Sequence, residues 1–139
     1  MIYLDASAFV AVFAPEPMSA SILAYLERYR EQLIVSTWTL TEAKSALSLK
    51  VRTGALNVSQ ARVVEGAMTR GAAAEFERIA VENSAIVEAG KFLLLGGPPL
   101  RAGDALHLAI AQQVGAQLLT LDRGLARAAA HFTVPVASI

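Results

Sequence analysis

The chain has no cysteine, only two histidines, and no excess of either charge. The lack of cysteine excludes disulfides, thiolate metal sites and a cysteine nucleophile, and two histidines are too few for a histidine-rich zinc site. Any metal ion would therefore have to be held by oxygen atoms. Because the net charge is zero, binding to nucleic acid would need a local patch of basic side chains rather than a global field.

Long apolar runs are also lacking. No run approaches the roughly 18 residues that a membrane helix needs, and an aspartate interrupts the apolar start where a signal peptide would have none. We therefore expect a cytoplasmic protein that makes no use of a membrane. Hydrophobic residues are nevertheless abundant, at 55% against 17% charged, which excludes intrinsic disorder and leaves apolar surface for a partner. A length of 139 residues fits a single domain over residues 1–139.

Short apolar runs alternate with amphipathic segments along the whole chain. Strands are expected at residues 1–4, 33–36, 76–81, 118–121 and 133–136. Helices are expected at residues 6–14, 19–31, 39–52, 59–74, 84–95, 104–114 and 123–130. This alternation predicts an α/β fold of three layers, with a central parallel sheet of about four to five strands and helices on both faces.

Only three of the twelve acidic residues are aspartates, and each adjoins apolar sequence. Asp5 and Asp122 end predicted strands, Asp104 begins a predicted helix, and Glu42 lies in the first turn of another. In a parallel sheet the strand ends and the helix starts that follow them share one edge, so we expect these four carboxylates to converge. Such a cluster repels itself unless a cation neutralises it, and Mg²⁺ or Mn²⁺ takes carboxylate ligands.

A structural alternative exists for each acidic residue. Asp5, Asp104 and Asp122 could each cap the helix that follows, and Thr39 and Glu42 have the spacing of a capping box. Caps alone would not explain why every aspartate falls at a converging edge.

Four segments resemble the PIN-domain ribonucleases, in particular the VapC toxins of bacterial toxin–antitoxin pairs. They are YLDASAFV at 3–10, TLTEAKSAL at 39–47, LRAGDALHLAIA at 100–111 and LLTLDRGLA at 118–126. The resemblance implies a PIN-like fold and a metal-dependent endoribonuclease whose acidic metal site consists of Asp5, Glu42, Asp104 and Asp122. It also implies a homodimer and a VapB-like antitoxin that covers the site.

The resemblance further implies that the hydroxyls of Ser7 and Thr120 support the carboxylates. Many relatives carry another acidic residue where this chain has Gly124, which puts a fifth carboxylate in doubt. We expect Asp5, Asp104 and Asp122 to hold Mg²⁺ or Mn²⁺, which would lower the pKa of a bound water and neutralise the phosphate oxygens. Glu42 would orient that water or help to hold a second ion.

RNA would need cations near this acidic pocket. Arg101 and Arg123 are the candidates closest in sequence to the carboxylates, and Lys44 follows Glu42 on its helix. Lys50 and Arg52 are expected to be solvated helix charges.

Three other residues, of types that often bear function, are expected to have no catalytic role. His107 is expected to pack on an apolar helix rather than bind metal, and His131 to lie on the surface. Trp38 is expected to pack, although it could stack on a base.

Two other functions remain open. A non-catalytic PIN-like module would bind nucleic acid or protein through the same fold. An Asp- and Mg²⁺-dependent phosphatase-like enzyme would also place an aspartate after its first strand, but it would want a second acid where this chain has Ser7.

Overall fold

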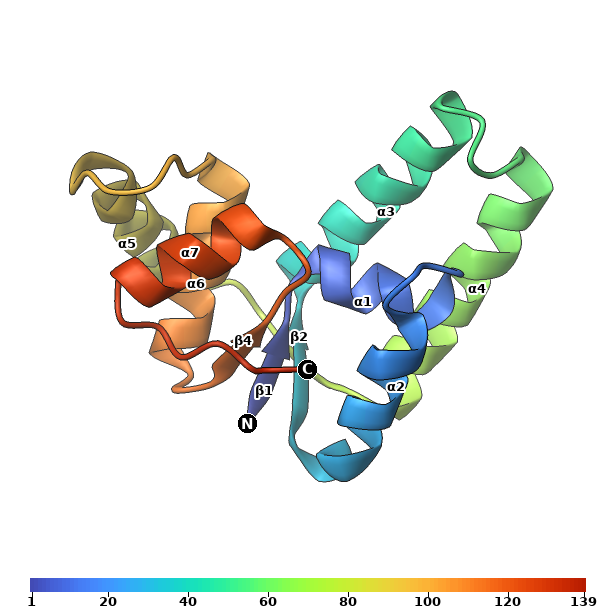
Figure 1. The fold of residues 1–139 in the computed structure, drawn as a ribbon, viewed down its shortest axis with the longest axis horizontal. Coiled ribbons are helices and arrows are strands. Elements are labelled where there is room, and N and C mark those ends of the chain that lie inside the picture. The colour runs from blue at the N-terminus through green and yellow to red at the C-terminus, as the bar shows by residue number, and fades with distance from the viewer.

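A parallel four-stranded sheet forms the middle of the molecule. The computed structural model describes residues 1–139, except for the side chain of Glu31. The strands follow the order β3-β2-β1-β4, with β1 at Ile2–Leu4, β2 at Leu33–Ser36, β3 at Glu77–Ile79 and β4 at Gln117–Leu119. All three strand pairings are parallel, so the carboxyl ends of the strands share one edge, the upper one in Figure 1.

Helices cover both faces of this sheet, as the sequence predicted. On one side lie α1 (Ala6–Phe13), α2 (Ser19–Arg28), α3 (Thr37–Arg52) and α4 (Val58–Ala74), with a 3₁₀ turn at Arg30–Gln32. On the other side lie α5 (Asn83–Leu94), α6 (Ala102–Gln113) and α7 (Arg123–His131), so the two groups of helices flank the sheet in Figure 1. The three-layer α/β fold is therefore confirmed.

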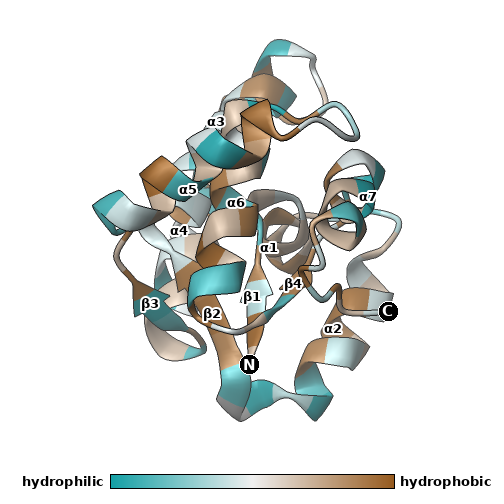
Figure 2. Cartoon of the chain, turned by 90° about the vertical axis from the view of Figure 1, so that its left-hand side faces the viewer, coloured by the Kyte–Doolittle hydropathy of each residue, from teal (hydrophilic) through white to brown (hydrophobic). Residues whose placement is uncertain are grey.

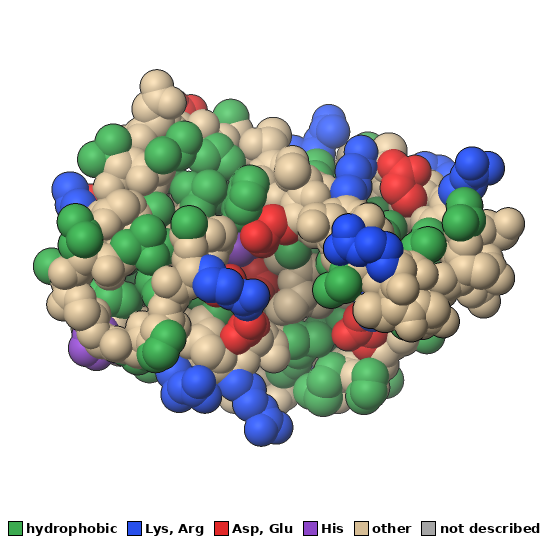
Figure 3. Space-filling model, turned by 90° about the horizontal axis from the view of Figure 1, so that it is seen from above, with side chains coloured by type: hydrophobic (Ala, Val, Ile, Leu, Met, Phe, Trp, Pro, Cys, Tyr) green, Lys and Arg blue, Asp and Glu red, His purple; other side chains and the backbone are tan. Residues whose placement is uncertain are grey.

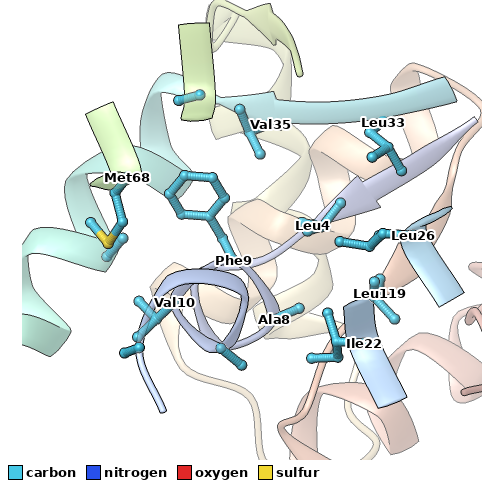
Figure 4. Close-up of a cluster of buried hydrophobic side chains, with 14 of the residues drawn as sticks. Leu4, Ala8, Phe9, Val10, Ile22, Leu26, Leu33, Val35, Met68 and Leu119 are labelled. Atoms are coloured by element: carbon cyan, nitrogen blue, oxygen red, sulfur yellow. The ribbon is translucent and has the colours of Figure 1, made fainter. Parts of the chain in front are cut away.

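The strand side chains alternate between two apolar cores, because successive residues of a strand point to opposite faces. Leu4 and Val35 join the core beneath α1 to α4, which Figure 4 shows around Phe9. Tyr3 and Ile34 join the core beneath α5 to α7. Burial on both faces explains why β2 is hydrophobic for most of its length in Figure 2.

Two predictions about elements were wrong. Residues 133–136 do not form a strand; Val136 makes only an isolated bridge to Leu118. Thr133 has a φ of 58°, in the left-handed region, so the chain turns directly after α7 instead of extending. The helix predicted at 39–52 begins at Thr37, because Ser36 caps it and forms a capping box with Thr39.

Candidate acidic site

Asp5 lies at the carboxyl end of the central strand β1, with only 4% of its surface exposed. Its Oδ1 accepts the amide of Ala8 at 2.9 Å, so it caps α1. The Ser7 hydroxyl donates to both carboxylate oxygens, at 2.8 and 2.9 Å, and the Thr120 hydroxyl donates to Oδ2 at 2.6 Å. Burial raises the pKa of Asp5, while these hydrogen bonds favour the charged form and oppose that rise.

The same two hydroxyls join the ends of β1 and β4. Ser7 Oγ accepts the amide of Leu121 at 2.9 Å, and Thr120 Oγ1 accepts the amide of Asp122 at 3.0 Å. Both hydroxyls therefore fix Asp5 relative to the loop that carries Asp122. This cross-link spans more than a hundred residues of sequence.

Asp122 and Asp104 are bridged by one cation. Asp122 caps α7, since its Oδ1 accepts the amides of Gly124 and Leu125 at 2.6 and 3.0 Å. Arg101 Nε lies 3.2 Å from Asp104 Oδ2, and its Nη2 lies 3.5 Å from Asp122 Oδ2. In Figure 3, which looks onto the carboxyl edge of the sheet, acidic side chains gather near the middle of the face with a basic side chain across them.

Nearby carboxylates determine the electrostatics of Arg101. The hydrogen bond and charge of Asp104, followed by the charges of Asp122 and Glu42, raise the pKa of Arg101. Because the guanidinium is exposed to solvent, each contact contributes only modestly to stability. The position nonetheless identifies the place where negative charge converges.

Glu42 is held by a buried histidine. It lies in the second turn of α3, not in the first turn as predicted, and its Oε2 is 2.7 Å from His107 Nε2. His107 is 1% exposed, and its Nδ1 lies 2.7 Å from the Tyr3 hydroxyl. The Tyr3 hydroxyl in turn lies 2.8 Å from Ser36 Oγ, in the capping box of α3. The prediction of a packed histidine is confirmed, but its contact with Glu42 was not anticipated.

Gly103 is a second residue that sequence reasoning missed. A Cβ at this position would lie 2.5 Å from Glu42 Oε1 and 3.3 Å from the Trp38 ring, so only glycine lets the start of α6 approach Glu42 this closely. The sequence held one usable signal for His107: it follows Asp104 by three residues, and this spacing puts both side chains on one face of a helix.

The capping alternative holds for some of the acidic residues. Asp5 and Asp122 cap α1 and α7, whereas Asp104 is the third residue of α6 and Arg101 occupies the N-cap position. Glu42 takes no part in a capping box, because Ser36 and Thr39 form the box instead. Capping therefore explains one oxygen of Asp5 and one of Asp122, and neither Asp104 nor Glu42.

The basic side chains predicted to contact RNA differ in their surroundings. Arg101 contacts the carboxylates, and Arg123 is exposed as the first residue of α7. Lys44 is instead paired with Glu65 of α4 at 3.6 Å. The expectation that Lys50 is a solvated helix charge was wrong, because its side chain is only 28% exposed and its Nζ lies 2.7 Å from Glu16 Oε1.

Two expected structural residues are confirmed. Trp38 is half-buried and packs against the core beneath α5 to α7. His131 is exposed at the end of α7.

The four acidic side chains have the right chemistry for a divalent metal ion, but they are not arranged around a common point. Among the side chains that the structure describes, no group of three or more His, Asp or Glu residues stands ready to hold a metal. Two of the four carboxylates share Arg101, and Glu42 is directed to His107. The donors are all carboxylate oxygens, the ligands that Mg²⁺ and Mn²⁺ prefer, and Arg101 lies where a cation is wanted. A metal ion at this point would replace that guanidinium.

The fold and the site together define an α/β domain with a carboxylate-rich centre at the carboxyl edge of its sheet. The sequence matches the PIN domain over residues 2–131, so the chain belongs to the PIN domain family. None of the helices in the described part of the chain is long and apolar enough to cross a membrane.

Solved structures share this fold at low sequence identity. FitAcB from Neisseria gonorrhoeae is 21% identical, with a TM-score of 0.75 over 99% of this chain and 97% of that one. VapC20 from Mycobacterium tuberculosis, described as a sarcin-ricin loop cleaving toxin, is 16% identical, with a TM-score of 0.72 over 91% and 93%. VapBC2 from Rickettsia felis, bound to a promoter DNA fragment, is 16% identical, with a TM-score of 0.68 over 99% and 98%. No curated protein matches the sequence.

Proposed function

We propose that the protein is a metal-dependent endoribonuclease and the toxin of a VapBC-type toxin–antitoxin pair. One observation carries the proposal: Arg101 bridges Asp104 and Asp122, and the Ser7 and Thr120 hydroxyls join the buried Asp5 to the loop that carries Asp122. Membership of the PIN domain family and the resemblance of the fold to a toxin that cleaves the sarcin-ricin loop support it.

Each side chain has a distinct part in the proposed hydrolysis. Asp5, Asp104 and Asp122 would hold Mg²⁺ or Mn²⁺, and Glu42 would orient the attacking water. The ion would supply a lower pKa for that water and positive charge against the phosphate oxygens. Ser7 and Thr120 keep the Asp5 carboxylate in place through the hydrogen bonds described above.

Once the aspartates held a metal ion, Arg101 would be free to contact a phosphate of the substrate RNA. The exposed Arg123 would contact a second phosphate. Lys44 is a weaker candidate, because Glu65 already neutralises it.

The proposed partners are a VapB-like antitoxin and a second copy of the chain. Structures with the same fold include toxin–antitoxin complexes from Klebsiella pneumoniae and Rickettsia felis. Apolar side chains stay exposed along α5, among them Ile86 at 55% and Leu94 at 90%, and such surface favours a protein partner.

A non-catalytic PIN module is the second candidate, since Arg101 and His107 already satisfy three of the carboxylates without a metal. No observation favours the phosphatase-like alternative.

The test uses purified, antitoxin-free protein incubated with structured and unstructured RNA in Mg²⁺, Mn²⁺ or EDTA. We expect cleavage with either ion, none in EDTA, and none for Asp5→Asn. Cleavage that persists in EDTA would contradict the metal mechanism, and failure to cleave under every condition would favour the non-catalytic module.

A further inference from the structure

A hollow of about 390 Å³ opens directly beside the acidic site. Ser7 and Asp122 form its edge on the side of the site, and Val10, Ala46 and Leu121 supply apolar wall. It lies between α1, α3 and the loop from β4 to α7. Its volume is within the range of small-molecule binding sites, which is roughly 300–1,000 Å³. Because Asp122 belongs to both the hollow and the acidic site, RNA bound at that site would pass next to the hollow.

The polar end of the hollow is an ion pair that is partly shielded from solvent. Lys50 Nζ, on α3, lies 2.7 Å from Glu16 Oε1, and the two side chains are only 28% and 25% exposed. The backbone of Glu16 is held in place, because its amide N–H donates to Ser19 Oγ at 3.0 Å. The pair keeps unused capacity, since an ammonium has three N–H donors and a carboxylate has two acceptor oxygens. It can therefore hydrogen-bond to an occupant without separating.

The charges of the residues that line the hollow indicate which kind of ligand it can bind. Glu16 and Asp122 carry two negative charges and Lys50 carries one positive charge, so a second phosphate is repelled. A nucleobase is neutral, has two apolar faces, and carries donors and acceptors along its edge. This distribution of polarity matches apolar walls that end in a carboxylate beside an ammonium.

We propose that the hollow receives the nucleobase next to the cut phosphate of RNA, and that Glu16 and Lys50 read its edge. The inference rests on the proposed function for its substrate class. Adenine and cytosine present an amino donor beside a ring-nitrogen acceptor. The amino group would donate to Glu16, and the ring nitrogen would accept from Lys50. Uracil presents a carbonyl in place of that amino group and must shift along the ion pair to bring its N3–H to Glu16, so a hollow that holds the base in one register disfavours it.

The first arm of the test measures binding without cleavage. Adenosine, cytidine and uridine are titrated into the full chain in EDTA, and the methyl signals of Val10, Ala46 and Leu121 are followed by NMR. We expect adenosine and cytidine to shift these signals at lower concentrations than uridine. Ala46→Leu fills the hollow and should abolish the shifts, whereas Ala20→Leu on the exposed part of α2 should not.

The second arm measures preference in RNAs that differ only at the base beside the cut. For the wild type we expect adenine or cytosine to be preferred over uracil by about fivefold, the size of one net hydrogen bond. In Lys50→Met and Glu16→Gln the preference should fall below about twofold. Arg30→Met breaks the exposed pair with Glu75 instead and should keep the wild-type preference.

The two arms separate this inference from the proposed function. If the wild type cleaves no RNA, the nuclease proposal fails, and the NMR arm still decides whether the hollow binds a base. Absence of shifts with all three nucleosides would overturn the inference, as would equal shifts with all three. An unchanged base preference in both Lys50→Met and Glu16→Gln would overturn the role of the ion pair.

Discussion

His107 Nε2 lies 2.7 Å from Glu42 Oε2, and the two residues are joined across the space between α6 and α3. Burial raises the pKa of Tyr3, so its hydroxyl stays protonated. That hydroxyl lies 2.7 Å from His107 Nδ1, and the other ring nitrogen of His107 is the one that contacts Glu42. A chain of buried hydrogen bonds thus holds the Glu42 carboxylate in one orientation.

Removing this chain should affect both stability and activity. His107→Leu leaves the Tyr3 hydroxyl without its partner in the core and frees Glu42 to turn away. We expect the free energy of unfolding to fall by about 1–3 kcal/mol in urea titrations. We also expect RNA cleavage to fall by at least about tenfold at protein concentrations where the fold is intact.

His131→Leu is the matched control, because this second histidine is exposed at the end of α7. It should change neither quantity. His107→Gln, whose amide can still donate to Glu42, should recover part of the activity lost in His107→Leu. Equal losses in the leucine and glutamine variants would argue against a positioning role.

Asp5 should make the metal-free protein depend on pH in an unusual direction. Since burial raises the pKa of Asp5 in the folded state, its contribution to stability is present below the unfolded pKa and is lost as pH rises through the folded pKa. Asp5→Asn removes this loss. In EDTA at neutral pH we therefore expect Asp5→Asn to unfold at a higher urea concentration than wild type, although it is inactive.

The comparison is repeated at acidic pH, where both side chains are neutral and the difference should shrink. An Asp5→Asn variant that is less stable than wild type at neutral pH would show that the hydrogen bonds to the carboxylate outweigh its burial.

Arg101 should compete with a metal ion for the aspartates. In Arg101→Gln the competing charge is gone, so we expect Mn²⁺ to bind more tightly by up to about fivefold, the limit set by an exposed ion pair. Electron paramagnetic resonance of free Mn²⁺ gives the affinity without any RNA. Arg62→Gln on α4 should leave it unchanged, and weaker Mn²⁺ binding in Arg101→Gln would contradict the competition.

Substitution of Gly103 tests the close approach between α6 and α3, and substitution of Gly90 on α5 serves as its control. Gly103→Ala places a methyl group 2.5 Å from Glu42 Oε1, so it should displace that carboxylate and reduce RNA cleavage. Gly90→Ala on α5 meets open space and should raise the free energy of unfolding by about 1 kcal/mol through helix propensity. Full cleavage by Gly103→Ala would show that Glu42 tolerates displacement.

Local sequence predicted the positions of Asp5 and Asp122, because each follows a short apolar strand whose end is marked by a cap. It could not predict the contact between Glu42 and His107, since that depends on how α3 and α6 pack across the sheet. The ion pair of Lys50 and Glu16 could not be predicted for the same reason, because the sequence of a helix does not show which loop its lysine will contact. The predicted strand at 133–136 failed because its β-forming residues follow a left-handed turn at Thr133.

The most direct measurement is a crystal structure of the protein soaked in Mn²⁺, with anomalous scattering recorded at the manganese edge. We expect a peak within bonding distance of carboxylate oxygens from Asp5, Asp104 and Asp122, with Arg101 turned away from them. Absence of a peak at saturating Mn²⁺, with Arg101 still bridging Asp104 and Asp122, would contradict it.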